Sequence, residues 1–104
     1  MSTNKSFSTE TSERYSRALF EVSKESNELD KVESDIKNLR SLLDSSLDIV
    51  NFLKDPSQSI SQQNKAINLI SEKLEFSKNL KNFLFLLIEK RRIYFVKKIS
   101  ESFI

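Results

Sequence analysis

Glycine is absent from all 104 residues of this chain, and proline occurs only once, at Pro56. Two-residue hairpin turns need positive φ angles, which glycine usually supplies. Phosphate-binding loops of the Rossmann and Walker types depend on glycine as well, because backbone amides close around a phosphate only where no side chain intervenes. The sequence therefore predicts an all-α fold and argues against nucleotide-binding loops.

Histidine and cysteine are also absent. Their absence removes the usual zinc ligands, cysteine nucleophiles and imidazole bases. Carboxylates, hydroxyls and lysines remain, but a solvated helix face explains every group of them. We therefore expect no enzymatic activity, no metal site and no cofactor, and we interpret the chain as a helical binding module.

The length and the hydrophobic content of 38% suit one modest core, and therefore a single compact domain. Residues 1–10 lack the apolar core of a secretory signal, and no stretch approaches the ~20 apolar residues of a membrane-spanning helix. Residues 1–11 are rich in serine and threonine and are predicted to form a flexible tail. The bundle itself is expected to occupy residues 12–104.

Apolar residues recur at spacings of three and four along the chain, which is the pattern of amphipathic helices. The cleanest of these stripes belongs to the second of six helices that we expect. The first is expected at about residues 12–25, the second at about 29–44, the third after Ser46, the fourth after Ser59 or Ser61, the fifth after Ser77 and the sixth from about Arg92.

The boundaries of these helices are predicted from residues other than glycine. Ser59 or Ser61 is expected to cap the fourth helix, and Ser77 to cap the fifth, because a serine hydroxyl can accept a hydrogen bond from a free backbone amide. The third helix must stop at Asp55, since Pro56 disfavours helical geometry in the residue before it. Residues 55–59 are therefore expected to form a turn.

The last predicted helix runs to Phe103 and Ile104 without a polar cap or a C-terminal glycine. Such an end leaves carbonyl groups and apolar surface without an evident partner. We interpret the chain as a domain whose carboxy-terminal continuation is missing, with a naturally frayed terminus as the alternative.

Two of the predicted helices carry more apolar surface than one core-facing stripe requires. The second stripe of the first helix lies roughly 110° to 120° around from its core-facing residues, by the 100° step of an α-helix. Core-facing residues are expected to be Ser16, Leu19, Phe20 and Ser23 on the first helix and Leu80, Phe83, Leu84 and Leu87 on the fifth; the second stripes are Tyr15, Ala18 and Val22, and Phe85 and Leu86.

If the two helices lie side by side, their second stripes would form a groove with an apolar floor and polar rims. Such a groove is the usual receptor for an amphipathic helix. Ala18 would suit the floor because its methyl group lets an incoming backbone come close, while Glu89 and Arg92 would stand at the rim. The alternative is that other helices of the bundle bury both stripes, since runs of apolar residues are more often core than interface.

Charge is distributed unevenly along the chain. Residues 78–104 contain seven basic and two acidic residues, whereas residues 1–77 contain ten basic and 13 acidic residues. A solvated helix face is the usual explanation for such a run. The alternative function is a basic helical adaptor domain that binds nucleic acid or an anionic membrane surface, although no alternation of aromatic and basic residues supports it.

Five segments resemble, in order and spacing, the delta subunit of F-type ATP synthases, which is called the oligomycin-sensitivity-conferring protein in mitochondria. Ser16 and Ser23 stand where alanines are usual in that family, and Lys90 replaces the usual asparagine. The five segments are RYSRALFEV at 14–22, LDKV at 29–32, FLKDP at 52–56, the helix entry at 60–65, and NFLFLLIEKRRI at 82–93.

This resemblance implies a six-helix amino-terminal domain that sits on the catalytic head and binds the amino-terminal helix of an alpha subunit between its first and fifth helices. A carboxy-terminal segment that is missing here would hold the membrane-anchored b subunits, so that the head does not turn with the rotor. On this basis we expect partner contacts at Tyr15, Ala18, Val22, Phe85, Leu86, Glu89 and Arg92.

The expected function is therefore that of a non-catalytic peripheral-stalk, or stator, subunit. Its expected location is the cytoplasmic face of a bacterial inner membrane, with contact to the membrane only through the complex and none to nucleic acid. An organellar protein in its mature form would look similar.

Overall fold

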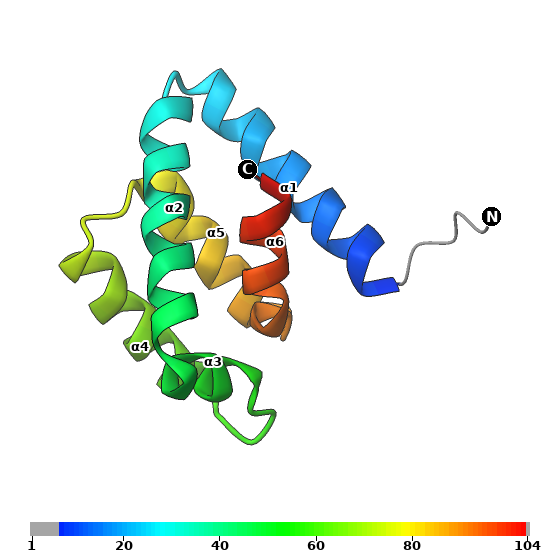
Figure 1. The fold of residues 1–104 in the computed structure, drawn as a ribbon, viewed down its shortest axis with the longest axis vertical. Helices are drawn as coiled ribbons and strands as arrows, with labels where there is room; N and C mark the ends of the chain where they lie inside the picture. The colour runs from blue at the N-terminus through cyan, green and yellow to red at the C-terminus, as the bar shows by residue number, and fades with distance from the viewer. Residues whose placement is uncertain (1–6, 104) are drawn as a thin grey trace.

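The computed structural model describes residues 7–103, and every regular element in that range is helical (Figure 1). The prediction of an all-α, six-helix bundle is confirmed for this range. The radius of gyration of 13.4 Å is that of a compact domain of this length. The elements are α1 (Phe7–Glu25), α2 (Leu29–Ser45), α3 (Leu47–Lys54), α4 (Ile60–Lys73), α5 (Lys78–Glu89), a 3-10 turn η1 (Ile93–Phe95) and α6 (Val96–Phe103).

The first helix starts earlier than the sequence suggested. α1 begins at Phe7, so the predicted tail is wrong at residues 7–11, while residues 1–6 lie outside the described range. Thr11 and Ser12 are each only 1% exposed. Serine and threonine are weak helix formers, but α1 packs along α6, and tertiary packing overrides such modest propensities.

The end of the last helix also differs from the prediction. Phe103 is not left without apolar contact, because its ring centroid lies 6.2 Å from that of Phe20 on α1 and its side chain packs against the core. Ser102 is joined to α1 as well, through a 3.2 Å hydrogen bond from the Ser16 hydroxyl. α6 thus packs between α1 and α2 in Figure 1. The final residue, Ile104, lies outside the described range.

Serine caps start three of the helices, as their hydroxyl chemistry predicts. The Ser46 hydroxyl accepts the Ile49 amide at the start of α3, and the Ser77 hydroxyl accepts an amide at the start of α5. Ser59 caps α4 within a full capping box, in which the Gln62 side chain reaches back to the Ser59 backbone amide. These caps fix where each helix begins.

The other helix boundaries are set by Pro56 and by three left-handed residues. α3 ends at Lys54 and Asp55 is extended, as expected for a residue before proline. α1, α4 and α5 each end in the double hydrogen-bond pattern of a Schellman motif, although that motif usually places glycine at its left-handed position. Those positions are held by Asn27, Glu75 and Arg91, with φ angles of 58°, 55° and 58°.

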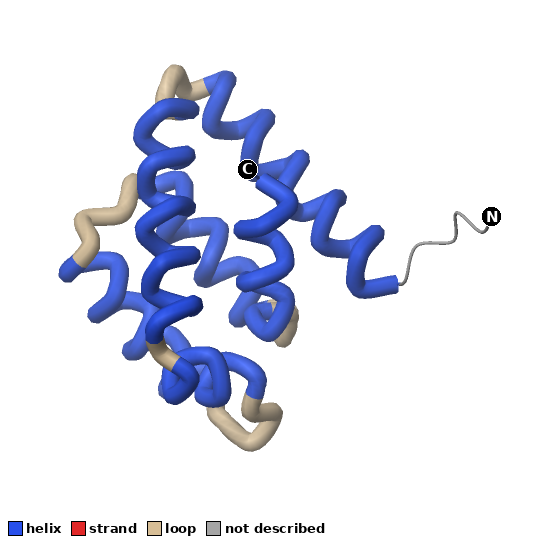
Figure 2. Tube along the Cα trace, viewed as in Figure 1, coloured by secondary structure: helices blue, strands red, loops and turns tan. Residues whose placement is uncertain are grey.

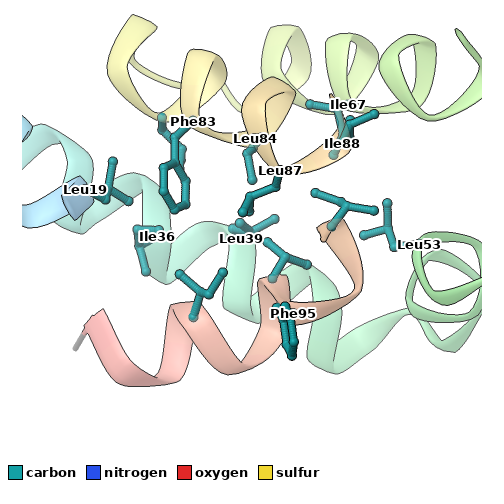
Figure 3. Close-up of a cluster of buried hydrophobic side chains, with 14 of the residues drawn as sticks. Leu19, Ile36, Leu39, Leu53, Ile67, Phe83, Leu84, Leu87, Ile88 and Phe95 are labelled. Atoms are coloured by element: carbon teal, nitrogen blue, oxygen red, sulfur yellow. The ribbon is translucent and has the colours of Figure 1, made fainter. Parts of the chain in front are cut away.

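The core lies where α2, α5 and α6 meet, with α1, α3 and α4 closing its sides (Figure 3). The side chains labelled in Figure 3 come from each of the helices α1 to α5 and from η1, and they gather in the space that these elements enclose. Connections between helices are short in Figure 2, so successive helices must turn back onto one another. The buried apolar residues are Leu19, Val32, Ile36, Leu39, Leu43, Leu53, Ile67, Leu80, Phe83, Leu84, Leu87, Ile88, Ile93, Phe95, Val96 and Ile99.

A buried carboxylate sets the position of α5. Asp35 on α2 is 1% exposed, and it accepts the backbone amide of Ser77 at 2.6 Å and the Lys31 ammonium group at 2.8 Å. Lys31 also donates to the carbonyl of Glu75. Because a buried charge must be paired and hydrogen-bonded, this cluster holds the start of α5 firmly against α2.

Candidate partner-binding surface

α1 and α5 lie in contact along the bundle and run in opposite directions. Asn79, in the first turn of α5, donates from its side-chain amide to the Ser26 hydroxyl just beyond the end of α1. Further along α5, the Phe83 ring meets the Tyr15 ring edge-on, with centroids 6.2 Å apart and an interplanar angle of 71°. The side-by-side arrangement assumed from the sequence is therefore correct.

α1 presents two faces, largely as its sequence predicts. Leu19, Ser16 and Ser23 are buried against the bundle. Ala18 is exposed and Val22 is 42% exposed, so the other helices leave this second stripe open. Of the residues expected on the core face, only Phe20 departs, since it is 41% exposed at the edge nearest α6.

Tyr15 lies at the base of the open stripe. It is partly buried, packs against the core through its ring, and accepts a 3.2 Å hydrogen bond at its hydroxyl from the Arg92 guanidinium group. The Arg92 guanidinium carbon also lies 5.9 Å from the centre of the Tyr15 ring. Arg92 therefore ties the region after α5 to α1.

On α5, Leu86 faces the same side as the residues that touch α1. It follows Phe83 by three positions and Asn79 by seven, which places all three on one side of the helix. Leu86 is nevertheless 40% exposed, because it lies at the outer edge of that side. Glu89, three residues further on, is exposed beside it.

Phe85 does not join this surface, although the sequence placed it there with Leu86. Two residues after Phe83, it is turned by roughly 200° from the side that meets α1. It packs instead against the core from the far side of α5, with the Lys81 ammonium group 5.9 Å from its ring centre. The sequence grouped Phe85 with Leu86 because both residues leave the core-facing side of α5. Residues that leave this side can, however, lie on either of two other sides of the helix.

We call the resulting surface the α1–α5 strip. It contains an apolar row flanked at one end by a charge of each sign, and it offers shape and apolar area rather than reactive groups. Within residues 7–103, no three His, Cys, Asp or Glu side chains gather as a metal ion would require. Its members are Tyr15, Ala18, Val22, Leu86, Glu89 and Arg92.

The comparisons with known proteins identify the family. A family model described as "ATP synthase delta (OSCP) subunit" matches residues 11–104. The chain belongs to the ATP synthase delta (OSCP) subunit family. This membership agrees with the expectation of a non-catalytic subunit of ATP synthase, which the resemblance of the five segments had suggested.

Relatives named "ATP synthase subunit delta" include one from Pelagibacter ubique, 39% identical over 104 residues, and one from Rhodospirillum rubrum, 32% identical over 104 residues. Each alignment covers 100% of this chain and 56% of the relative. A chain in the cryo-EM structure of the Toxoplasma gondii mitochondrial ATP synthase hexamer superposes with a TM-score of 0.84 at 28% identity, covering 88% of this chain and 51% of that one. The chain thus spans about half the length of the delta subunits it matches.

No helix in the described part of the chain is both long enough and apolar enough to cross a bilayer.

Proposed function

We propose that this domain is part of the peripheral stalk of an F-type ATP synthase and binds the amino-terminal helix of an alpha subunit on the α1–α5 strip. The observation that carries the proposal is the exposure of Val22 and Leu86, at 42% and 40%, on adjoining helices of a delta-family domain. Apolar side chains aligned on two neighbouring helices suit an amphipathic partner helix, which buries residues at spacings of three and four.

Within this proposal, each residue of the strip has a distinct task. Ala18 lies between the larger side chains of Tyr15 and Val22 on α1, so a partner backbone can approach closely there. Val22 and Leu86 supply apolar area on the two walls, as anchors near the centre of interfaces usually do. Glu89 and Arg92 contact polar groups at the rim, where ion pairs guide orientation more than they add affinity.

The mechanical task of a stator is to resist torque, which requires tight binding by a rigid domain. The buried Asp35 cluster and the hydrogen bond from Arg92 to Tyr15 hold α5 in place against α2 and α1. Apolar burial then supplies affinity without chemistry. In the full-length protein, a carboxy-terminal segment would hold the b subunits, and the complex would lie at the cytoplasmic face of a bacterial inner membrane.

The alternative, a basic adaptor for nucleic acid or membranes, has less support. Several of the carboxy-terminal cations already have partners within the protein. Arg91 donates to the carbonyl of Gln58, Arg92 to Tyr15, and Lys97 lies 3.7 Å from the carboxylate of Asp44. An open basic face for phosphates would leave these groups free.

The proposal is tested by titrating the domain with a synthetic peptide of the alpha subunit's amino-terminal segment, at low and at high salt. Ala18→Asp is expected to weaken binding by about a hundredfold or more, because it buries an unpaired charge. Ser34→Asp, on an exposed position of α2, is the matched control and should bind normally. Far-ultraviolet circular dichroism should show both variants fully helical.

Unchanged affinity for Ala18→Asp would remove the strip from the interface. Binding by the unsubstituted domain that collapses at high salt would favour the basic adaptor instead, since that mode depends on counterion release.

A further inference from the structure

A small pocket lies where the end of α3 and the turn at Pro56 face the segment that follows α5. We call it the α3–η1 pocket, and its volume of about 370 Å³ is that of a site for a small organic molecule. It shares no residue with the α1–α5 strip. The residues that line the pocket are Leu53, Lys54, Asp55, Pro56, Gln63, Arg91, Ile93 and Tyr94.

Gln63, on α4, brings to this pocket a polar group that lacks a partner. The residue is 3% exposed, and its backbone amide is bonded to the Ser59 carbonyl at the start of the helix. Its side-chain Oε1, however, is buried without a hydrogen-bond partner among the described residues. A buried amide oxygen without a partner destabilises the structure that holds it. A ligand that donates a hydrogen bond to this oxygen would remove that cost.

The lining of the pocket carries more positive than negative charge. Lys54 is exposed and forms no ion pair with a described residue. Arg91 donates one N–H to the Gln58 carbonyl at 2.7 Å, which fixes the guanidinium group and leaves its other N–H groups for a ligand. Asp55 is the one carboxylate among the described lining residues, and its oxygens already accept the Ser57 amide and hydroxyl groups and the Gln58 side-chain amide. The pocket therefore suits an anion.

A flat aromatic face belongs to the same lining. Tyr94 is 47% exposed, and its ring lies against that of the buried Phe95, with the centroids 4.3 Å apart. Leu53 and Ile93, which also line the pocket, are buried and apolar. A planar ring that enters the pocket can therefore stack on Tyr94 and lie against an apolar wall.

We propose that the α3–η1 pocket binds a mononucleotide. The base stacks on Tyr94 and its edge bonds to the Gln63 amide, while the phosphate lies between Lys54 and Arg91. The edge of a base carries hydrogen-bond donors and acceptors side by side, as the side-chain amide of glutamine does. Lysine and arginine bind phosphate through charge-assisted hydrogen bonds.

Such a site needs no glycine-rich loop, because side chains and not backbone amides make the phosphate contacts. The absence of glycine from the sequence therefore argues against Rossmann and Walker loops but not against this pocket. The inference goes beyond the proposed function, since it uses no residue of the α1–α5 strip and no contact with another subunit.

Two-dimensional NMR of the isotope-labelled chain, titrated with AMP to about 10 mM, tests the proposal. The side-chain amide signals of Gln63 and the backbone signal of Tyr94 should shift with a common Kd. Adenosine, which lacks the phosphate, should bind at least about fivefold more weakly, and inorganic phosphate alone should not move the Gln63 side-chain signals. No shift at Gln63, or equal binding of adenosine and AMP, would overturn the proposal.

Gln63→Leu separates a binding role from a structural one, because it keeps a side chain of similar volume but removes the amide. It should stabilise the free chain against urea, since an unpartnered buried oxygen is gone, and it should weaken AMP binding by about tenfold. A loss of stability would show that the amide is already satisfied in the free chain, and unchanged AMP binding would remove it from the site. Either result would contradict the proposal.

Lys54→Met tests the phosphate contact. It should weaken AMP binding by about threefold or more and leave adenosine binding unchanged. Lys65→Met, at an exposed position of α4 outside the pocket, is the matched control and should change neither. Equal effects of the two substitutions would reject a specific phosphate contact at Lys54. None of these measurements uses the alpha-subunit peptide, so their failure is distinguishable from failure of the α1–α5 strip.

Discussion

Replacing Glu75 by glycine should stabilise this domain. Glu75 holds the left-handed position at the end of α4, with φ of 55°, and its side chain is exposed. The backbone is fixed there by the Schellman bond from the Phe76 amide to the Ser71 carbonyl, at 2.9 Å. The Glu75 carbonyl also accepts the Lys31 ammonium group, a bond that glycine would keep because it involves only the backbone.

The expected gain is a difference between two terms. A residue with a Cβ atom loses about 1–2 kcal/mol in the left-handed region, which glycine does not lose. Glycine also gives the unfolded chain more conformational freedom, and this lowers the free energy of unfolding by about 0.4–1 kcal/mol. The net gain in the free energy of unfolding is therefore about 0.5–1 kcal/mol, or a rise in Tm of about 2 to 8 °C for a domain of this size.

Urea and thermal unfolding of the purified chain measure this gain. Glu75→Ala is the matched control, since it removes the same side chain but keeps the Cβ atom, and it should change stability by less than about 0.5 kcal/mol. Asn27→Gly should gain less than Glu75→Gly, because asparagine tolerates left-handed geometry better. Equal stability of Glu75→Gly and Glu75→Ala would show that the left-handed backbone carries no strain at this position.

Three further substitutions separate folding from binding. Asp35→Ala should lower the free energy of unfolding by about 3 kcal/mol, measured in urea, because it removes the acceptor of the buried Ser77 amide; a loss below 1 kcal/mol would contradict this. Leu84→Ala should lower the free energy of unfolding by about 2–5 kcal/mol in the same assay, since Leu84 is fully buried. Leu86→Ala should lower it by less than about 1.5 kcal/mol and yet weaken binding of the alpha-subunit peptide. The reverse order of the two losses would contradict the assignment of the faces of α5. Ser59→Ala should cost about 1 kcal/mol by removing the α4 capping box, and no change would mean that the α4 start is fixed by other contacts.

Local chemistry in the sequence was sufficient to place most helix ends and the core-facing side of α5. Serine hydroxyls at Ser46, Ser59 and Ser77 act on amides only three residues away, and Pro56 acts on its immediate neighbour, so no tertiary information is needed. The 3.6-residue period likewise predicts that Leu84 is buried. Such effects are short-range, and a sequence expresses them directly.

Local chemistry could not predict the features that depend on how the helices are placed beside one another. The period predicts that Phe85 and Leu86 leave the core face, but only the position of α1 determines that Leu86 borders the strip while Phe85 packs on the opposite side of α5.

The start of α1 at Phe7 and the contact of Phe103 with Phe20 have the same origin. Each depends on residues far apart in the chain, because burial is decided by the sum of contacts around a side chain and not by its neighbours in sequence. The sequence by itself therefore determined a glycine-free helical bundle and the apolar stripes that its core does not need. The tertiary structure decided which side chains of those stripes remain open to a partner, as Val22 and Leu86 do, and which are packed, as Phe85 is.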